Sequence, residues 1–358
     1  MNIAKIFFIL LTSIFFIACN TPNDVKKDEN KSELNTTLNK EVNTSKFNTK
    51  TVTSIKEVDC KLSNGQASIC YEITIQGFPA DRAKLGPNCP TTITTEAKDS
   101  GKWFDKGILY DATGEFVKNL DTFYNDPEWK LYDETTGKIR ITNTQESCEA
   151  AARPDVDAKY TNHCVECDIS YYSKVVEKGI ESTFTIPKIP VPTAKSNSIG
   201  RGGVGVALDG VKMDSSAPTD AILAAHTIAA FDDCVGHVNP HVGYHYHGAN
   251  QGEGTCPSIP FEKDGHSGMI GYALDGYAIY GMLDKEGKES EDLDNCRGHS
   301  DAVRGYHYHA AGAGENTFIG CFKGETAIVQ GQEGQPPFGE RPDGPPPNGK
   351  PPHEVEGK

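Results

Sequence analysis

Short stretches in which hydrophobic and polar residues alternate occur along much of the chain, and such alternation is typical of β-strands with one buried face. Residues 56–62 and 67–76 flank the turn-forming segment Ser-Asn-Gly-Gln at 63–66, and together they predict a β-hairpin. Shorter strand-like runs lie at residues 102–110 and 138–142. The pattern predicts a mainly β, β-rich α+β fold.

Other segments predict connectors and short helices. Residues 184–192 alternate but contain three prolines, which favours an edge strand or a connector. Residues 147–152 are consistent with one helical turn before Arg153-Pro154. Residues 218–226 begin with a proline and an acid before an alanine-rich run, and they predict a short helix.

The N-terminus resembles a bacterial lipoprotein signal. Residues 1–19 carry one lysine, an apolar run and a small residue before Cys19, which would become the lipidated first residue. The apolar run is shorter than the roughly 18 residues of a membrane-spanning helix. We therefore predict attachment to a membrane through an N-terminal lipid. Lys27-Asp28-Glu29 favours an outer membrane lipoprotein, periplasmic or surface-facing.

Composition divides the rest of the chain. Residues 20–50 are so polar that they cannot bury enough surface to offset the entropy of ordering, and they predict a disordered tether. The C-terminal end is rich in proline and glycine and predicts a disordered tail. The predicted organisation is a signal peptide at 1–19, the tether at 20–50, a β-rich disulfide-containing region at 51–183, a duplicated domain at 184–324 and the tail at 325–358.

Residues 184–324 contain an internal sequence repeat. The sequence Gly-Tyr-His-Tyr-His occurs at residues 243–247 and again at 305–309, each time preceded by Asp-x-Cys-x-Gly-His and five further residues. An Ala-Leu-Asp-Gly turn at 207–210 has a counterpart at 273–276, so the period is 62 to 66 residues. Two such units predict tandem pseudo-repeats that pair about a pseudo-twofold axis. Asp209 and Asp275 of these turns are interpreted as turn residues beside glycine.

The repeated motif also predicts a chemistry. In a strand, its tyrosines share one face and its histidines the other, and the large tyrosines are expected to pack inward. Neutral imidazole is the commonest protein ligand of zinc and copper, and two histidines two residues apart can hold one ion. The predicted ligands are His245, His247, His307 and His309, with His237 and His299 as third ligands and His226 and His266 in reserve. The alternative is that these histidines are structural and form hydrogen-bond ladders.

These motifs together resemble the YHYH protein family, which is named for this sequence. The resemblance covers roughly residues 184–323. It implies membership of the family and no particular activity.

The cysteines agree with export. Without Cys19, ten remain, an even number in a protein expected outside the reducing cytoplasm. Cys60 and Cys70 flank the predicted hairpin turn and are expected to lie opposite one another as a disulfide. Equivalent positions in the two units suggest Cys234 with Cys256 and Cys296 with Cys321. Three pairings remain open for the last four, Cys89, Cys148, Cys164 and Cys167, and disulfides are favoured over a Cys-x-x-Cys zinc or redox site.

Charge and missing motifs limit the function. The formal charge of −15 argues against nucleic acid as a partner, because phosphates require a basic surface. The scarcity of methionine favours Zn²⁺ or Cu²⁺ over Cu⁺. The leading hypothesis is an exported lipoprotein that presents paired histidine sites for zinc or copper. The alternatives are a non-catalytic extracellular module that binds glycan or protein, and a metal-dependent hydrolase or oxidase. The pattern does not decide whether the protein is an enzyme.

Overall fold

The computed structural model describes residues 39–328 except 154, 175–177, 201 and 251–259. The predicted signal peptide with Cys19, and Cys256, lie outside the described residues. No helix in the described part of the chain has the length and hydrophobicity needed to cross a membrane.

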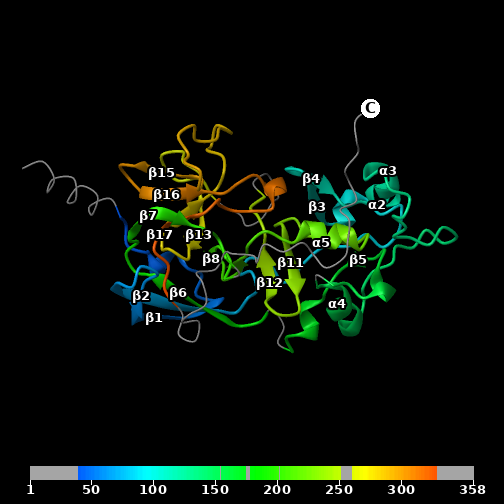
Figure 1. Ribbon diagram of the computed structural model, residues 1–358, viewed down its shortest axis with the longest axis horizontal. Coiled ribbons are helices and arrows are strands. Elements are labelled where there is room, and N and C mark those ends of the chain that lie inside the picture. Colours follow the sequence, from blue (N-terminus) through cyan, green and yellow to red (C-terminus); the bar gives the residue numbers. More distant parts are fainter. Residues whose placement is uncertain (1–38, 154, 175–177, 201, 251–259, 329–358) are drawn as a thin grey trace, which may run out of the picture. The chain divides into compact units, whose positions relative to one another are not determined.

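One sheet of eight strands contains both repeats (Figure 1). Its strands, in chain order, are β8 (Gly205–Ala207), β9 (Lys212–Met213), β11 (Gly236–Asn239), β12 (Gly243–Tyr246), β13 (Met269–Ala273), β14 (Ala278–Tyr280), β15 (Gly298–Asp301) and β16 (Gly305–His309). Their order in space is β11-β12-β9-β8-β13-β14-β16-β15. Both Gly-Tyr-His-Tyr-His segments form strands, as predicted, with His247 directly after the end of β12.

The strand order confirms the predicted pseudo-twofold arrangement. Each strand of the first unit has its counterpart at the same distance from the centre of the sheet. At the centre, β8 and β13 run antiparallel with Val206 opposite Tyr272, and these two residues are equivalent in the repeat. A pair that maps onto itself in this way is the isologous contact of a twofold symmetric assembly.

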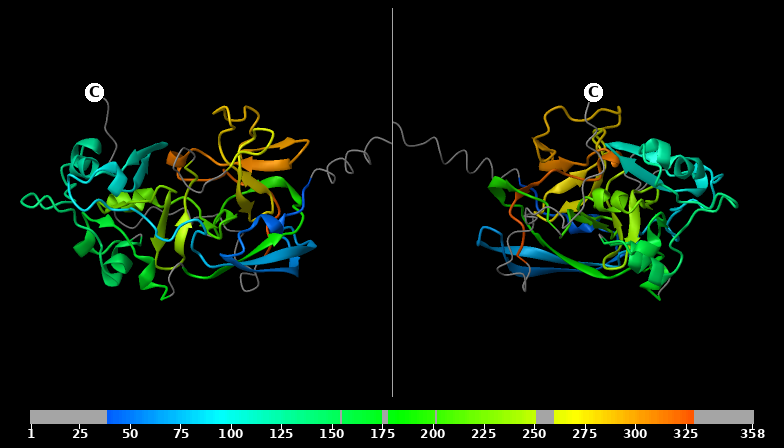
Figure 2. Two further views of the ribbon diagram at one scale, coloured as in Figure 1. Left: turned by 180° about the vertical axis from the view of Figure 1, so that it is seen from behind. Right: turned by 45° about the vertical axis from the view of Figure 1, so that its right-hand side comes forward.

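A second sheet packs beneath the first. It consists of β1 (Val52–Lys61), β2 (Ala67–Ile75) and β6 (Ser182–Pro187) in that order, so the proline-containing segment forms an edge strand. Ile73 and Ile186 of this sheet share a hydrophobic core with Val206 and Tyr272. Figures 1 and 2 show this sheet below the strands of the second unit.

The predicted hairpin and its disulfide are confirmed. Cys60 and Cys70 form a disulfide with their Cα atoms 5.9 Å apart. We expected the two cysteines to lie directly opposite one another, but they do not. In the register, Cys60 faces Ser68 and Val58 faces Cys70. The disulfide therefore joins a diagonal pair.

The remaining elements are short. The strands are β3 (Lys102–Asp105), β4 (Ile108–Asp111), β5 (Cys164–Val165), β7 (Pro192–Asn197), β10 (Ile228–Ala229) and β17 (Phe322–Gly324). The four α-helices of the described residues are α2 (Gly114–Lys118), α3 (Leu120–Phe123), α4 (Gln145–Ala151) and α5 (Thr219–Ala224). Single 3₁₀ turns lie at Thr44–Lys46, Ala97–Asp99, Ala158–Tyr160, Ile169–Tyr171 and Ala313–Glu315. The short helices predicted near residues 147 and 218 are α4 and α5.

Two strand predictions need correction. The run at 102–110 is not one strand but the hairpin of β3 and β4, which turns at Lys106 and Gly107, both with positive φ. The run at 138–142 makes only isolated bridges. Trp103 and Trp129 are both buried in one core, where aromatic rings from β3, α2 and the loop after α3 meet.

The predicted tether is wrong for residues 39–50. Val42 and Phe47 are buried, and the Val42 amide donates to the Lys188 carbonyl oxygen over 2.9 Å. Two apolar side chains in a polar segment are enough to anchor it. Residues 20–38 lie outside the described part of the chain, as does the predicted tail beyond residue 328. The prediction of a disordered tail is wrong for residues 325–328, because Glu325 is buried and the Ile328 amide donates to the Lys61 carbonyl oxygen over 2.8 Å.

The other cysteines within the described residues form disulfides as well. Cys296 pairs with Cys321 as predicted, and the open set resolves into Cys89 with Cys164 and Cys148 with Cys167. Cys234 is also disulfide-bonded.

Candidate metal centres

The same hairpin positions the histidines in each unit. Strands β11 and β12 pair so that His237 lies directly opposite His245, and in the second unit β15 and β16 place His299 opposite His307. The third histidine of each group, His247 or His309, follows two residues later on the same face. Each hairpin therefore brings three imidazoles together.

The tyrosine face anchors each hairpin to the core. Tyr244 donates a hydrogen bond to Asp232 over 2.6 Å, and Tyr246 donates to Asp209 over 2.7 Å. In the second unit the equivalent bonds join Tyr306 to Asp294 over 3.0 Å and Tyr308 to Asp275 over 2.6 Å.

These bonds explain two motif positions. Asp209 and Asp275 are more than turn residues, and this corrects the prediction: burial raises the pKa of each carboxyl to about 6. The glycines of Asp-x-Cys-x-Gly-His, Gly236 and Gly298, lie under the tyrosine rings, where a Cβ atom would collide with the hydroxyl of Tyr244 or Tyr306.

The first cluster consists of His237, His245 and His247. The Nε2 atoms of His245 and His247 are 2.9 Å apart, and those of His247 and His237 are 3.2 Å apart. The ligand atoms all lie within 4.8 Å of one another. All three predicted ligands of the first unit are brought together.

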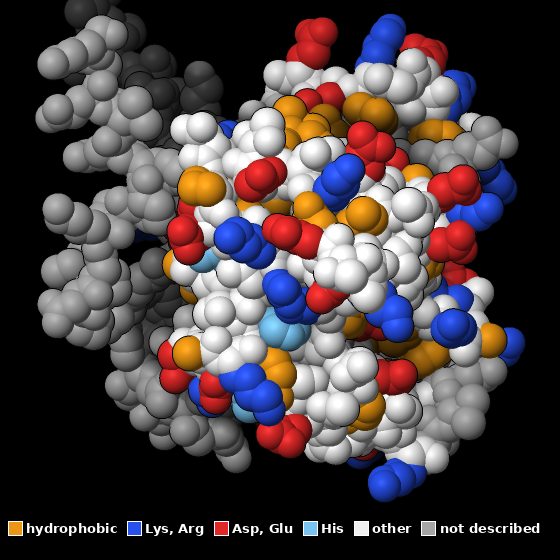
Figure 3. Space-filling model, turned by 90° about the vertical axis from the view of Figure 1, so that its right-hand side faces the viewer, with side chains coloured by type: hydrophobic (Ala, Val, Ile, Leu, Met, Phe, Trp, Pro, Cys, Tyr) orange, Lys and Arg blue, Asp and Glu red, His pale blue; other side chains and the backbone are white. Residues whose placement is uncertain are grey.

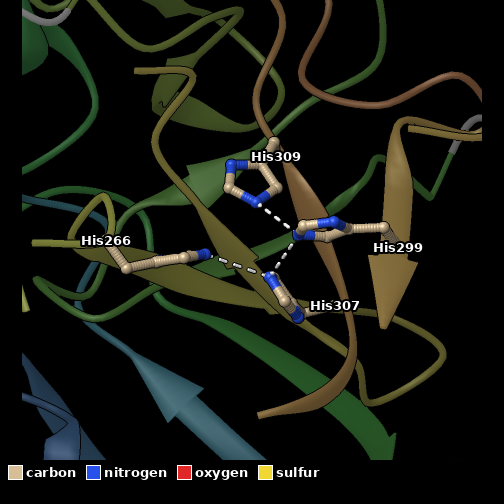
Figure 4. A group of neighbouring side chains, drawn as sticks. All are labelled: His266, His299, His307 and His309. Atoms are coloured by element: carbon tan, nitrogen blue, oxygen red, sulfur yellow. Dashed lines mark hydrogen bonds between the residues drawn. The ribbon is translucent and has the colours of Figure 1, made fainter. Parts of the chain in front are cut away.

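The second cluster has a fourth member. Figure 4 shows the rings of His266, His299, His307 and His309 pointing toward a common centre. The Nε2 atom of His307 is 3.0 Å from that of His299 and 3.2 Å from that of His266, and the Nε2 atoms of His309 and His299 are 3.1 Å apart.

Of the two histidines predicted as reserve ligands, only one lies in a cluster. His266 completes the second cluster. His226 belongs to neither: its Nε2 atom pairs with Asp126 over 2.9 Å, and its ring packs against Trp129.

The outer nitrogens decide where the ring protons lie. The Nδ1 atoms of His245, His247, His307 and His309 face the carbonyl oxygens of Gly243, Ser215, Gly305 and Gly281 at 2.7 to 3.0 Å. His266 Nδ1 faces the carbonyl oxygen of Ser267, and His299 Nδ1 faces the Asp292 carboxylate. These oxygens only accept, so each Nδ1 carries the proton. In a neutral ring with this tautomer, the Nε2 atom presents its lone pair to the neighbouring rings.

Burial favours the neutral form of six of the seven rings. It lowers the pKa of His247 and His309 to about 3 and that of His307 to about 4. It also lowers the pKa of His237, His245 and His266. Lone pairs held about 3 Å apart repel one another, and a bound cation removes this repulsion. Tetrahedral coordination at about 2.0–2.1 Å requires nitrogen-to-nitrogen distances of roughly 3.3 Å. The observed 2.9 to 3.2 Å is slightly shorter.

Comparison with known families gives one match. Residues 183–292 match the YHYH protein family. The predicted resemblance is thus confirmed over this segment, which we call the YHYH domain. It contains the first histidine cluster and ends before Asp294, so β15 and β16 with three histidines of the second cluster follow it. Searches of curated proteins and of solved structures found no match.

Sequence reasoning ranked one member of the second cluster too low and missed the residues around the first cluster. His266 has no counterpart at the equivalent place in the first unit, so the repeat did not single it out. The ion pair of Lys212 and Asp214, 2.9 Å apart beside the first cluster, was also missed. An alignment of the two repeats would have drawn attention to these two positions, because the second unit has Ala278 and Tyr280 there.

Proposed function

We propose that this protein is an exported, membrane-anchored lipoprotein whose YHYH domain and following hairpin bind two transition metal ions, zinc or copper. His237, His245 and His247 bind one ion, and His266, His299, His307 and His309 bind the other. The supporting observation is the orientation of the rings. In five of the seven rings, the Nδ1 atom faces a backbone carbonyl oxygen, so the Nε2 lone pair points into the cluster.

The outer contacts support a metal centre rather than a hydrogen-bond ladder. In a ladder of neutral histidines, one ring donates and the next accepts, so the protons alternate. Here the backbone holds the protons on the outside of both clusters. Hydrogen bonds from the outer nitrogen are the usual means by which proteins orient a metal-binding imidazole.

All-nitrogen donor sets suit ions of intermediate softness. Imidazole binds both Zn²⁺ and Cu²⁺ well, and neither cluster includes a cysteine or carboxylate. Anchoring through Cys19 would hold these sites at a membrane outside the cytoplasm. On the face shown in Figure 3, basic side chains are interspersed with acidic ones, which does not favour a polyanionic partner.

The test is metal content. Protein purified with its disulfides intact and equilibrated with zinc or copper should hold two ions per chain by elemental analysis. His245→Ala with His247→Ala should remove one ion, and His307→Ala with His309→Ala should remove the other.

His163→Ala is the matched control, because His163 lies outside both clusters and its Nδ1 atom contacts the Thr161 carbonyl oxygen. It should leave two ions bound. A metal-free wild-type protein would refute the proposal and favour the alternative of a glycan- or protein-binding module with structural histidines.

A further inference from the structure

A cavity lies beside the first histidine cluster. Its volume is about 380 Å³, and His237, His245 and His247 all line it. Its other walls include the end of α4, β5 with the two residues after it, and α5. A cavity of this size is within the range that holds small molecules.

The two clusters differ in the number of protein ligands. Among the described residues, the first has three histidines and the second has four. Three protein ligands leave one position of a tetrahedral ion for another molecule, whereas four fill it. The ring of Tyr280 also covers the second cluster, with its centroid 4.8 Å from that of His266 and 5.1 Å from that of His307. Asp214 occupies the equivalent position beside the first cluster.

The carboxylates near the first cluster are held by other partners. Asp214 accepts from Lys212 Nζ over 2.9 Å and from the Ser215 amide over 2.8 Å. Glu166 accepts from the Cys89 amide over 2.9 Å. Neither carboxylate belongs to the group of ligand atoms within 4.8 Å of one another. Because all three histidines of the first cluster line the cavity, a molecule in the cavity could reach the remaining position of a bound ion.

The cavity walls indicate the chemistry of the ligand. A divalent ion held by three neutral imidazoles keeps its full charge, and the Lys212, Arg153, Asp214 and Glu166 side chains that line the cavity cancel one another. The net charge favours an anionic donor. Val165, Ile222 and Ala229 form an apolar wall, which suits an organic body better than a strongly hydrated phosphate.

We propose that the three-histidine site binds a small organic carboxylate, with its carboxylate on the metal ion and its apolar body in the cavity. This inference rests on the metal-binding function proposed above. The four-histidine site is closed to such ligands.

Cobalt(II) is a suitable probe, because its visible spectrum reports changes in coordination. The His307→Ala, His309→Ala protein isolates the three-histidine site, and the His245→Ala, His247→Ala protein isolates the other. Each is loaded with Co²⁺ and titrated with benzoate, with inorganic phosphate and with benzyl alcohol, which lacks the carboxylate. Benzoate should produce a saturable spectral change at the three-histidine site only, and the other two compounds should not.

A cavity-filling variant tests the location. Ala221 lines the cavity from α5, so Ala221→Phe should weaken benzoate binding at least tenfold while Co²⁺ stays bound. Ala224→Phe, at an exposed position of the same helix, is the matched control and should bind benzoate normally.

The outcomes separate the two proposals. If neither protein binds Co²⁺, the metal-binding function fails. If Co²⁺ binds but benzoate leaves the three-histidine spectrum unchanged, the carboxylate site is refuted and metal binding stands. A benzoate response at the four-histidine site, or a response to phosphate alone, would also overturn the inference.

Discussion

Asp275 should make the stability of the protein depend on pH. This carboxyl is fully buried and accepts hydrogen bonds from the Tyr308 hydroxyl over 2.6 Å and the Gly324 amide over 2.9 Å. Burial raises its pKa from 3.8 to about 6. Asp275→Asn keeps the size of the side chain and removes the ionisation.

The sign follows from the raised pKa. The folded protein holds the proton more tightly than the unfolded chain, so this contribution to stability is fully present below pH 3.8 and is lost as the pH rises through about 6. A pKa difference of about 2 corresponds to about 3 kcal/mol, of which about 2 kcal/mol falls between pH 4 and pH 7. Over that interval the wild type should lose about 2 kcal/mol relative to Asp275→Asn.

The assay is urea unfolding of both proteins at several pH values, with disulfides intact and equal metal content. Using the difference between the two proteins cancels the titration of the histidines. Asp301→Asn is the control, because its pKa of about 2 in the folded protein makes its effect nearly constant above pH 4. If the free energies of unfolding of wild type and Asp275→Asn changed in parallel with pH, the pKa of the buried carboxyl would not be raised as the structure implies.

Three further predictions follow from single residues. Cys19→Ser should release the protein from membranes or leave it unprocessed in a fractionation experiment, and an unchanged membrane fraction would contradict the lipid anchor. His266→Ala should weaken metal binding at the second site by more than the roughly 10–100-fold typical of losing an outer contact, with the first site unaffected in a competition with chelator; equal affinities would remove His266 from the centre. Gly298→Ala should cost about 1–3 kcal/mol in urea unfolding, because the new Cβ meets the Tyr306 hydroxyl, and a neutral effect would show that the ring can move aside.

The repeat carried most of what the sequence could predict. Two copies of one motif in register revealed the strands, the twofold pairing, the opposite faces of Tyr and His, and six of the seven clustered histidines. Local patterns also found the hairpin at residue 63 and helices α4 and α5. All of these depend on neighbours in the sequence or on a comparison of the chain with itself.

The remaining features depend on contacts between distant segments. His266 contacts His307, which lies 41 residues away in the sequence, and no local sequence pattern predicts this contact. Val42 and Phe47 pack into a core formed by residues far away in the sequence, although the composition of their own segment predicts a disordered tether. The cavity likewise arises where α4, β5 and α5 meet the first hairpin, and four cysteines could be paired only once these segments were placed.

The palindromic order of the large sheet has a genetic consequence. In a dimer of two identical chains joined at one central pair, every mutation would appear in both halves at once. Here β8 and β13 form that joint within one polypeptide, so each half can change alone. One half carries Lys212 and Asp214 where the other carries Ala278 and Tyr280, and His266 belongs to the second cluster only. Fusion of the halves thus permits two histidine clusters in nearly matching frames to take on different tasks.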